Sequence, residues 1–437
     1  MGALLKKSNA PFLSLYRRFF TLHSVRFERR EERVLGESLT TFRRYVCVFL
    51  LVILGLSLGV SEFVVIGIEP ELAASFDVPL SRVGELISVY SATYAVLTPI
   101  LALTTGRLRR FQLLVAYSVF FCIGNMAAVI AVNFTSLLLA RALLGSVSGA
   151  LLAVGVTYIP ELVSKQRVSQ TIAIVYAAFS VAMVLATSLG RLIADRLNWE
   201  LALIGALMLA LVTCIALIAF LPRHGATDEP ATFHEQAGLL KEPCVLGGVS
   251  IFVFGVGSVY VFYGYVTPYL EQILGVSPTV SSAVLMGYGL ACLISNLASG
   301  WVASRFGLKA LIITFPVQAL LLFVLWLLGS STLPALVTVL LIGLSMYLVS
   351  VPCVTMFMGA AAQRHPKALT LASSLEPMAF NIGIAFGTAM GGMVVAGPGL
   401  ANVGFIGAVF SLVACVLATF TTFLEKRSRM LLEQDAL

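Results

Sequence analysis

The chain has 437 residues, of which 59% are hydrophobic and 11% are charged, and its formal net charge is +7. Soluble globular domains carry about 25% charged residues, so this composition excludes a soluble protein and predicts an integral membrane protein. Most basic residues lie in short connections between apolar segments, a pattern that reports membrane orientation, so we expect no nucleic-acid partner.

The first 45 residues are polar and basic, with ten Lys or Arg residues and four Glu residues. A secretory signal would place an apolar core directly after a short basic region, whereas here the first long apolar segment follows Arg43 and Arg44. We therefore expect a cytoplasmic tail. The alternative is an upstream extension that ordinary translation omits.

Twelve apolar segments follow along the chain. They lie near 46–68, 84–104, 112–133, 137–158, 171–193, 201–221, 244–268, 281–303, 309–329, 333–358, 370–395 and 401–424. Each approaches or exceeds the roughly 20 residues that a helix needs to cross a bilayer, and continuous apolar character favours helices over barrel strands. We predict an all-α membrane protein with twelve transmembrane helices.

The basic residues predict the orientation of these helices. Of the 28 Lys and Arg residues, 24 lie in the two termini and in the connections on the same side of the membrane. The other side holds at most Arg82, Arg191 and Arg196, while Arg141 lies within a predicted helix. The positive-inside rule then places both termini in the cytoplasm.

The two halves of the chain are related by an offset of 198 residues. The matching pairs are Gly59 and Gly257, Pro70 and Pro268, Tyr90 and Tyr288, Arg107 and Arg305, and Gly145 and Gly343. A parallel repeat of six-helix halves is typical of transporters with a site between the halves near the midplane. The predicted parts are a cytoplasmic tail 1–45, a six-helix bundle 46–221, a cytoplasmic linker 222–243, a second bundle 244–424 and a C-terminal cytoplasmic tail 425–437.

The cysteines and glycines indicate neither a metal site nor a nucleotide site. The seven cysteines stand singly, without metal-ligand spacing, and we interpret them as packing residues. The glycine pairs and runs, such as Gly145 with Gly149, match no phosphate-binding loop and are typical of close helix packing. No nucleophile–base set is apparent either, so we predict no cofactor, no metal and no enzymatic activity.

Several motifs together resemble a known family. They are Ser61-Glu62-Phe63-Val64, Val78-Pro79-Leu80-Ser81, Gly84-Glu85-Leu86-Ile87-Ser88-Val89-Tyr90, Leu138-Leu139-Ala140-Arg141-Ala142-Leu143-Leu144-Gly145 and Phe380-Asn381-Ile382-Gly383-Ile384-Ala385-Phe386-Gly387. Over residues 45–424 the chain resembles bacterial sugar-efflux and drug-efflux proteins of the proton-antiporter branch of the major facilitator superfamily. The resemblance implies a monomeric exporter in the bacterial inner membrane, which moves a small organic solute in exchange for protons by alternating access.

Three positions depart from the pattern of this family. Gly106 and Ser304 stand where the loop motif of the superfamily usually has Asp, and the segment before Gly190 lacks the usual Pro. A uniporter or proton-coupled importer on the same fold, with Glu62 in a structural role, is therefore the alternative function.

Glu62 and Arg141 are charged residues well inside the predicted helices of the first half. At 1.5 Å per residue both lie about 7–10 Å from the middle of their helices toward the outer side, so they could meet. A carboxylate at membrane depth usually has a function, so we predict that the pair serves proton coupling and substrate binding. A static ion pair is the alternative. We expect Glu69 to be an exposed carboxylate at the rim, and Glu376 is either a solvated helix start or a pathway residue.

The remaining candidates are polar or aromatic. Asn125 and Asn381 either contact substrate or form interhelical hydrogen bonds. Tyr90, Tyr94, Tyr260, Tyr263 and Tyr288 either line a substrate pocket or anchor helices at an interface. Basic residues at the cytoplasmic turns set topology and are candidates for a gate on that side; they are Arg107, Arg110, Arg305 and Lys309.

Overall fold

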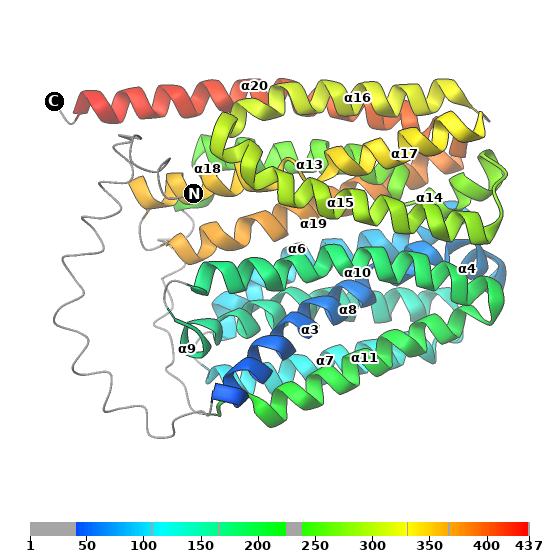
Figure 1. The fold of residues 1–437 in the computed structure, drawn as a ribbon, viewed down its shortest axis with the longest axis horizontal. Coiled ribbons are helices and arrows are strands. Elements are labelled where there is room, and N and C mark those ends of the chain that lie inside the picture. Colours follow the sequence, from blue (N-terminus) through cyan, green and yellow to red (C-terminus); the bar gives the residue numbers. More distant parts are fainter. Residues whose placement is uncertain are drawn as a thin grey trace, which may run out of the picture. The chain divides into compact units, whose positions relative to one another are not determined.

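The computed structural model describes residues 41–105, 108–164, 167–223, 238–329, 331–365 and 368–435, and every regular element in these ranges is helical (Figure 1). The prediction of an all-α protein is confirmed. Residues 1–40 of the predicted tail, most of the predicted linker, Gly106 and Arg107 lie outside the described residues.

The long helices match the predicted segments. In the first half they are α3 (Thr41–Gly67), α6 (Glu85–Thr105), α7 (Arg110–Val129), α8 (Phe134–Val156), α10 (Val168–Arg196) and α11 (Trp199–Phe220). In the second half they are α13 (Pro243–Tyr263), α15 (Pro278–Phe306), α16 (Leu311–Leu328), α17 (Thr332–Met346), α18 (Ser350–Arg364), α19 (Leu369–Ala396) and α20 (Val403–Asp435). The last helix continues through most of the predicted C-terminal tail.

Short helices mark the two ends of the bundle. One end holds α4 (Glu69–Ser75), α5 (Leu80–Val83), α14 (Val266–Pro268), η2 (Tyr269–Ile273) and η5 (Leu400–Asn402). The opposite end holds α9 (Ile159–Leu162) and η3 (Gly307–Ala310). We refer to them as the α4 end and the α9 end (Figure 1).

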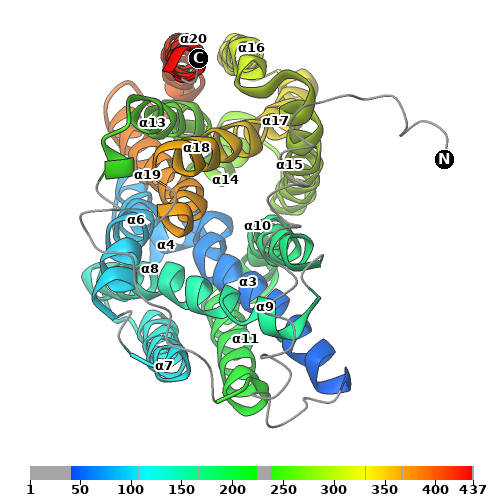
Figure 2. The same ribbon diagram turned by 90° about the vertical axis from the view of Figure 1, so that its left-hand side faces the viewer.

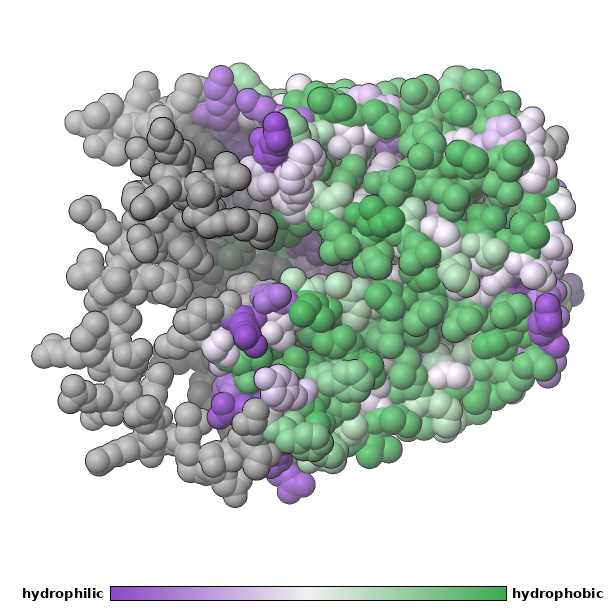
Figure 3. All heavy atoms as spheres, in the orientation of Figure 1, coloured by the Kyte–Doolittle hydropathy of each residue, from purple (hydrophilic) through white to green (hydrophobic). Residues whose placement is uncertain are grey.

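The described residues contain eleven helical stretches that are long and apolar enough to cross a membrane. The stretch Pro278–Leu328 has 51 residues, far more than one passage needs, and it consists of α15 and α16. The chain turns between them at Gly307, which has a φ of 55°. The eleven stretches therefore make twelve passages. Hydrophobic side chains cover the middle of the visible face and hydrophilic ones gather at its ends (Figure 3).

The tenth predicted segment is broken into two helices, α17 and α18. At the break, Ser295 of α15 accepts a hydrogen bond from the N–H of Tyr347 (3.0 Å), and Ser299 accepts one from the N–H of Val351 (3.1 Å). Backbone groups freed from a helix at membrane depth need such partners. The two serines thus stabilise the break, which positions Tyr347.

Residues Cys47–Leu437 form one compact unit in which the two halves of the chain meet along two helix pairs. Helix α10 packs against α15, and α6 packs against α19. Viewed end-on, α7 and α11 lie on one side of these pairs and α16 and α20 lie on the other (Figure 2). Helices α3, α6, α8 and α10 of the first half therefore lie nearest the second half.

The sequence repeat reappears as equivalent packing. A Cβ added to Gly145 of α8 would lie 2.1 Å from the carbonyl oxygen of Tyr90 on α6. A Cβ added to Gly343 of α17 would lie 3.0 Å from the carbonyl oxygen of Tyr288 on α15. The two residue pairs are related by the same offset of 198. Small residues at these positions let each helix pair approach closely.

Candidate functional site

Arg141 of α8 is almost fully buried, at 1% exposure, and ties three helices together. Its Nη1 donates to the carbonyl oxygen of Ser61, its Nη2 to that of Glu62 (2.8 Å) and its Nε to that of Leu86 (3.1 Å). Its guanidinium also lies 4.4 Å from the ring centroid of Tyr90, within cation–π distance. Arg141 therefore clamps α3 and α6 to α8.

Glu62 and Arg141 do meet, but through the main chain of Glu62. Among the ion pairs of the described residues, none includes the carboxylate of Glu62. The expected carboxylate–guanidinium pair is thus absent, because backbone carbonyls of α3 and α6 take the guanidinium N–H groups. Glu62 is 2% exposed, and its carboxyl group lies within electrostatic range of tyrosines from both halves. These tyrosines are Tyr90, Tyr94, Tyr260 and Tyr347.

The second half contributes a set of ring contacts that we call the aromatic cluster: Tyr260, Tyr263, Tyr288, Tyr347 and Phe380. Tyr263 stacks on Tyr288 with centroids 4.6 Å apart, and Tyr347 stacks on Phe380 at 5.1 Å. Tyr260 contacts both Tyr263 (5.6 Å) and Phe380 (6.4 Å). The structure thus brings together the three tyrosines predicted in this half.

Two members of the aromatic cluster, Tyr347 and Phe380, were missed by the sequence reasoning. The break between α17 and α18 brings Tyr347 to the cluster. This break could not be recognised from the sequence, because it lies inside a continuous apolar segment. Within the cluster the hydroxyl groups of Tyr260 and Tyr263 are buried and have no hydrogen-bond partner among the described residues. Buried hydroxyl groups of this kind are available to a polar solute.

The two asparagines form hydrogen bonds within their own helices or to a neighbouring helix. Asn125 of α7 accepts a hydrogen bond from Ser61 (2.8 Å) and donates to the carbonyl oxygen of Phe121 (3.0 Å). Asn381 donates to the carbonyl oxygen of Pro377 (3.1 Å), while its Oδ1 is buried without a partner among the described residues. The interhelical alternative therefore fits Asn125, whereas Asn381 keeps a free acceptor.

The two other acidic candidates lie at different places. Glu376 of α19 is half-buried and within electrostatic range of Tyr94 and Tyr347. Glu69 was expected to be an exposed carboxylate at the rim. This prediction is wrong, because Glu69 is 0% exposed. It begins α4, which packs against α14 of the other half and is covered there.

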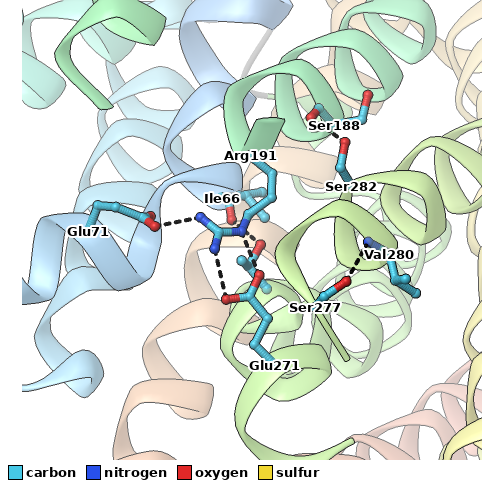
Figure 4. Close-up of polar contacts among 9 residues, drawn as sticks. Ile66, Glu71, Ser188, Arg191, Glu271, Ser277, Val280 and Ser282 are labelled. Carbon is cyan, nitrogen blue, oxygen red and sulfur yellow. Dashed lines mark hydrogen bonds and ion pairs between the residues drawn. The ribbon is translucent and has the colours of Figure 1, made fainter. Parts of the chain in front are cut away.

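The α4 end carries an ion-pair network between the two halves, shown in Figure 4. Arg191 of α10 binds Glu71 of α4 through Nη1 (2.5 Å). The same guanidinium binds both carboxylate oxygens of Glu271 on η2, at 2.5 and 2.9 Å. The Arg191 side chain is 4% exposed, so this arginine is held by two carboxylates largely out of water. We call these three residues the α4-end latch.

Hydrogen bonds reinforce the latch. Three hydroxyl groups of the second half donate to backbone carbonyl oxygens of the first half: Thr267 to Ile66 (2.6 Å), Ser282 to Ser188 (2.7 Å) and Tyr265 to Ser81 (3.1 Å). The hydroxyl oxygens of Ser88 and Thr388 lie 2.6 Å apart. Nearer the middle, polar contacts between the halves include those of Asn296 with Ser180 and of Tyr347 with Met183. The halves are therefore joined chiefly at the α4 end.

The predicted gating residues lie at the α9 end and, where described, do not join the halves. Arg110 binds Glu161, donates to the carbonyl oxygen of Thr157 (3.2 Å) and covers the ring of Tyr158, all within the first half. Arg305 and Lys309 are exposed. Arg107 lies outside the described residues.

Sequence reasoning missed the α4-end latch, although a signal was present. Arg191 is one of very few basic residues on its side of the membrane. The two acids lie just after the repeated prolines: Glu71 follows Pro70 by one residue, and Glu271 follows Pro268 by three.

Comparison with known proteins gives one family. The model of the Major Facilitator Superfamily matches residues 51–375 and, in a second match, 249–434. The MFS-type transporter YtbD of Bacillus subtilis is 28% identical over 374 residues, which cover 85% of this chain and 94% of YtbD. The MFS-type transporter YbcL of the same organism is 26% identical, covering 84% and 94%. The inner membrane transport protein YdhP of Escherichia coli is 27% identical, covering 82% and 92%.

Proposed function

This chain belongs to the Major Facilitator Superfamily, and on that basis we propose that it exports a small organic solute in exchange for protons. It is a multi-pass membrane transporter and not an enzyme. Export, proton coupling and the class of solute are our proposal. The observation that supports proton coupling is the position of the Glu62 carboxyl group. It is buried, has no ion-pair partner among the described residues and lies near tyrosines of both halves.

The proposed orientation places the α9 end in the cytoplasm, together with both chain termini. The excess of Lys and Arg on that side supports it. The bacterial inner membrane is the proposed location, supported by the printed description of YdhP as an inner membrane transport protein. The α4 end then faces outward, and the latch holds the protein closed toward the outside.

Solute then binds between two six-helix bundles, 46–221 and 244–424, which rock to expose it to either side. The aromatic cluster, with Tyr90, Tyr94 and Asn381, offers aromatic faces and free polar groups, a combination suited to a ring-bearing or polyhydroxyl solute. Fold alone does not choose among sugars, drugs and nucleosides.

Glu62 couples protons in this proposal without releasing Arg141. Because Arg141 binds backbone carbonyl oxygens, protonation of Glu62 leaves the clamp intact and instead removes a negative charge facing the second half. Burial makes a carboxylate without an ion-pair partner costly, so protonation favours the state in which the halves enclose Glu62. Ionised Glu62 favours the state in which it is hydrated.

The test uses proteoliposomes and the Glu62→Gln variant. Candidate solutes are first identified by a resistance and uptake screen of an overexpressing strain. In wild type, a solute gradient drives protons in the opposite direction; in Glu62→Gln this proton movement falls at least tenfold, because Gln has no titratable proton. Ser61→Ala, which removes the neighbouring hydrogen bond to Asn125, serves as the matched control and retains coupling. Undiminished proton movement in Glu62→Gln contradicts the role of Glu62.

The specific geometry of Arg141 also favours a second candidate, a uniporter or importer with Glu62 in a structural role. Arg141 binds Glu62 only at its backbone carbonyl oxygen. It therefore holds the helices together whether the carboxyl group of Glu62 is protonated or ionised. Solute flux that is independent of the pH gradient in wild type would establish this alternative.

A further inference from the structure

Glu69 is a second buried carboxyl group, seven residues after Glu62 and at the α4 end. The membrane span of α3 ends at Gly67, and Glu69 is the first residue of α4. It is 0% exposed, and neither of its carboxyl oxygens has a hydrogen-bond partner among the described residues. A carboxylate so placed has lost its water without gaining a donor, which is strongly unfavourable while it is ionised.

The charged and titratable groups on α4 and on the neighbouring elements of the α4 end are already engaged or uncharged. They are Glu71 on α4, Arg82 on α5, Arg191 on α10, Tyr263 and Tyr265 beside α14, and Tyr269 and Glu271 on η2. Arg191 is shared between Glu71 and Glu271, and Arg82 binds Glu85. Tyr263 and Tyr265 lie within electrostatic range of Glu69 but carry no charge at neutral pH. Nothing among these groups supplies a positive charge to the carboxyl group of Glu69.

We propose that Glu69 is a proton-binding site of the closed α4 end, separate from Glu62, which takes up a proton when the α4-end latch closes and releases it when the latch opens. Closing covers α4 with α14 of the opposite half; opening separates the halves and returns the carboxyl group to water. Consistent with this, burial raises the pKa of Glu69 well above its ordinary range in the closed state.

Closure of the α4 end depends on pH through the proton bound by Glu69. Between the ordinary pKa of a hydrated Glu and the raised pKa of the closed state, the closed form holds one proton that the open form lacks. The closed form is therefore favoured fully at low pH and loses this contribution as pH rises through its raised pKa. One proton changes the ratio of open to closed molecules by up to about tenfold per pH unit.

The α4-end latch itself responds in the opposite direction, which makes the two effects separable. Protonation of Glu271 weakens its ion pair with Arg191 and favours opening as pH falls. Protonation of Glu69 favours closing as pH falls. This inference rests on the proposed function for its role in transport, but the opening of the α4 end is measurable without any solute.

The experiment measures the distance between spin labels at Ser75→Cys and Gln272→Cys, both exposed, on either side of the α4 end. The native cysteines are replaced, and the full chain is studied in lipid nanodiscs between about pH 5 and 8, the range between the ordinary pKa of Glu and a strongly raised one. In wild type we expect the short-distance population to rise as pH falls, by up to about tenfold per unit. In Glu69→Gln and Glu69→Leu we expect a mainly closed population without this rise.

Glu71→Gln is the matched control on the same short helix. It weakens the latch, so its open population is larger at every pH, but it retains the pH response because Glu69 is intact. The proposal is overturned if Glu69→Gln and Glu69→Leu respond to pH as wild type does, or if wild type opens or does not respond as pH falls. Undiminished proton exchange in Glu62→Gln, which contradicts the role of Glu62, would leave this result unaffected, so the two proposals fail independently.

Discussion

Replacing Arg191 by Gln will open the α4 end and abolish transport. Arg191 forms three contacts with two carboxylates from opposite halves, and its side chain is 4% exposed. Removing one partner of a buried ion pair costs about 3–5 kcal/mol, because the remaining charges are left without compensation. The carboxylates here are 16–25% exposed and recover some hydration. We therefore expect the ratio of open to closed molecules to rise on the order of a hundredfold.

The spin-label pair at Ser75→Cys and Gln272→Cys measures this change as a shift to longer distance. Arg196→Gln is the matched control, since Arg196 ends the same helix, is exposed and has no ion pair among the described residues. It should leave the distance distribution unchanged. An Arg191→Gln distribution identical to that of wild type would show that the latch does not hold the halves together.

The second large effect is expected at Arg141. Lys in its place keeps the positive charge but lacks the planar fork of donors, so it cannot bond the carbonyl oxygens of Ser61, Glu62 and Leu86 together. Hydrogen bonds to a charged group contribute about 1.5–3 kcal/mol each, so losing even two destabilises the first half by on the order of 4 kcal/mol. Solute transport should fall below detection because α3 is no longer fixed against α8.

Thermal unfolding in detergent measures the loss of stability. Arg141→Lys should lower the apparent Tm by at least about 5 °C. Arg110→Lys is the control, because Arg110 forms its ion pair with Glu161 near the surface, where such pairs contribute about 0–1 kcal/mol. An Arg141→Lys protein with the Tm and transport rate of wild type would contradict the clamp.

The class of fold could be predicted from the sequence alone, because each transmembrane passage is a long apolar segment. The parallel repeat was also recoverable, since close packing requires Gly145 and Gly343 at equivalent places against Tyr90 and Tyr288. The break after Met346 was not, because an apolar segment looks the same whether it is one helix or two. Its position depends on Ser295 and Ser299 of another helix.

For the candidate site, the sequence identified the buried residues but not their partners. Depth along the helix brought Glu62 and Arg141 together correctly, yet depth cannot tell whether an arginine binds a carboxylate or a carbonyl oxygen. Glu69 was placed at a solvated rim because its burial arises from the other half of the chain. Contacts of this kind depend on how the two halves pack together. The periodicity and spacing of residues in the sequence hold no information about that packing.

Alternating access between the two halves is the central claim, and a covalent bond across the α4 end tests it most directly. Because the hydroxyl oxygens of Ser88 and Thr388 lie 2.6 Å apart, Ser88→Cys with Thr388→Cys in a background without native cysteines should form a disulfide after mild oxidation. We predict that the oxidised double variant transports no solute, that reduction restores transport, and that each single variant is active under both conditions. Solute transport at the wild-type rate with the disulfide intact would contradict the account.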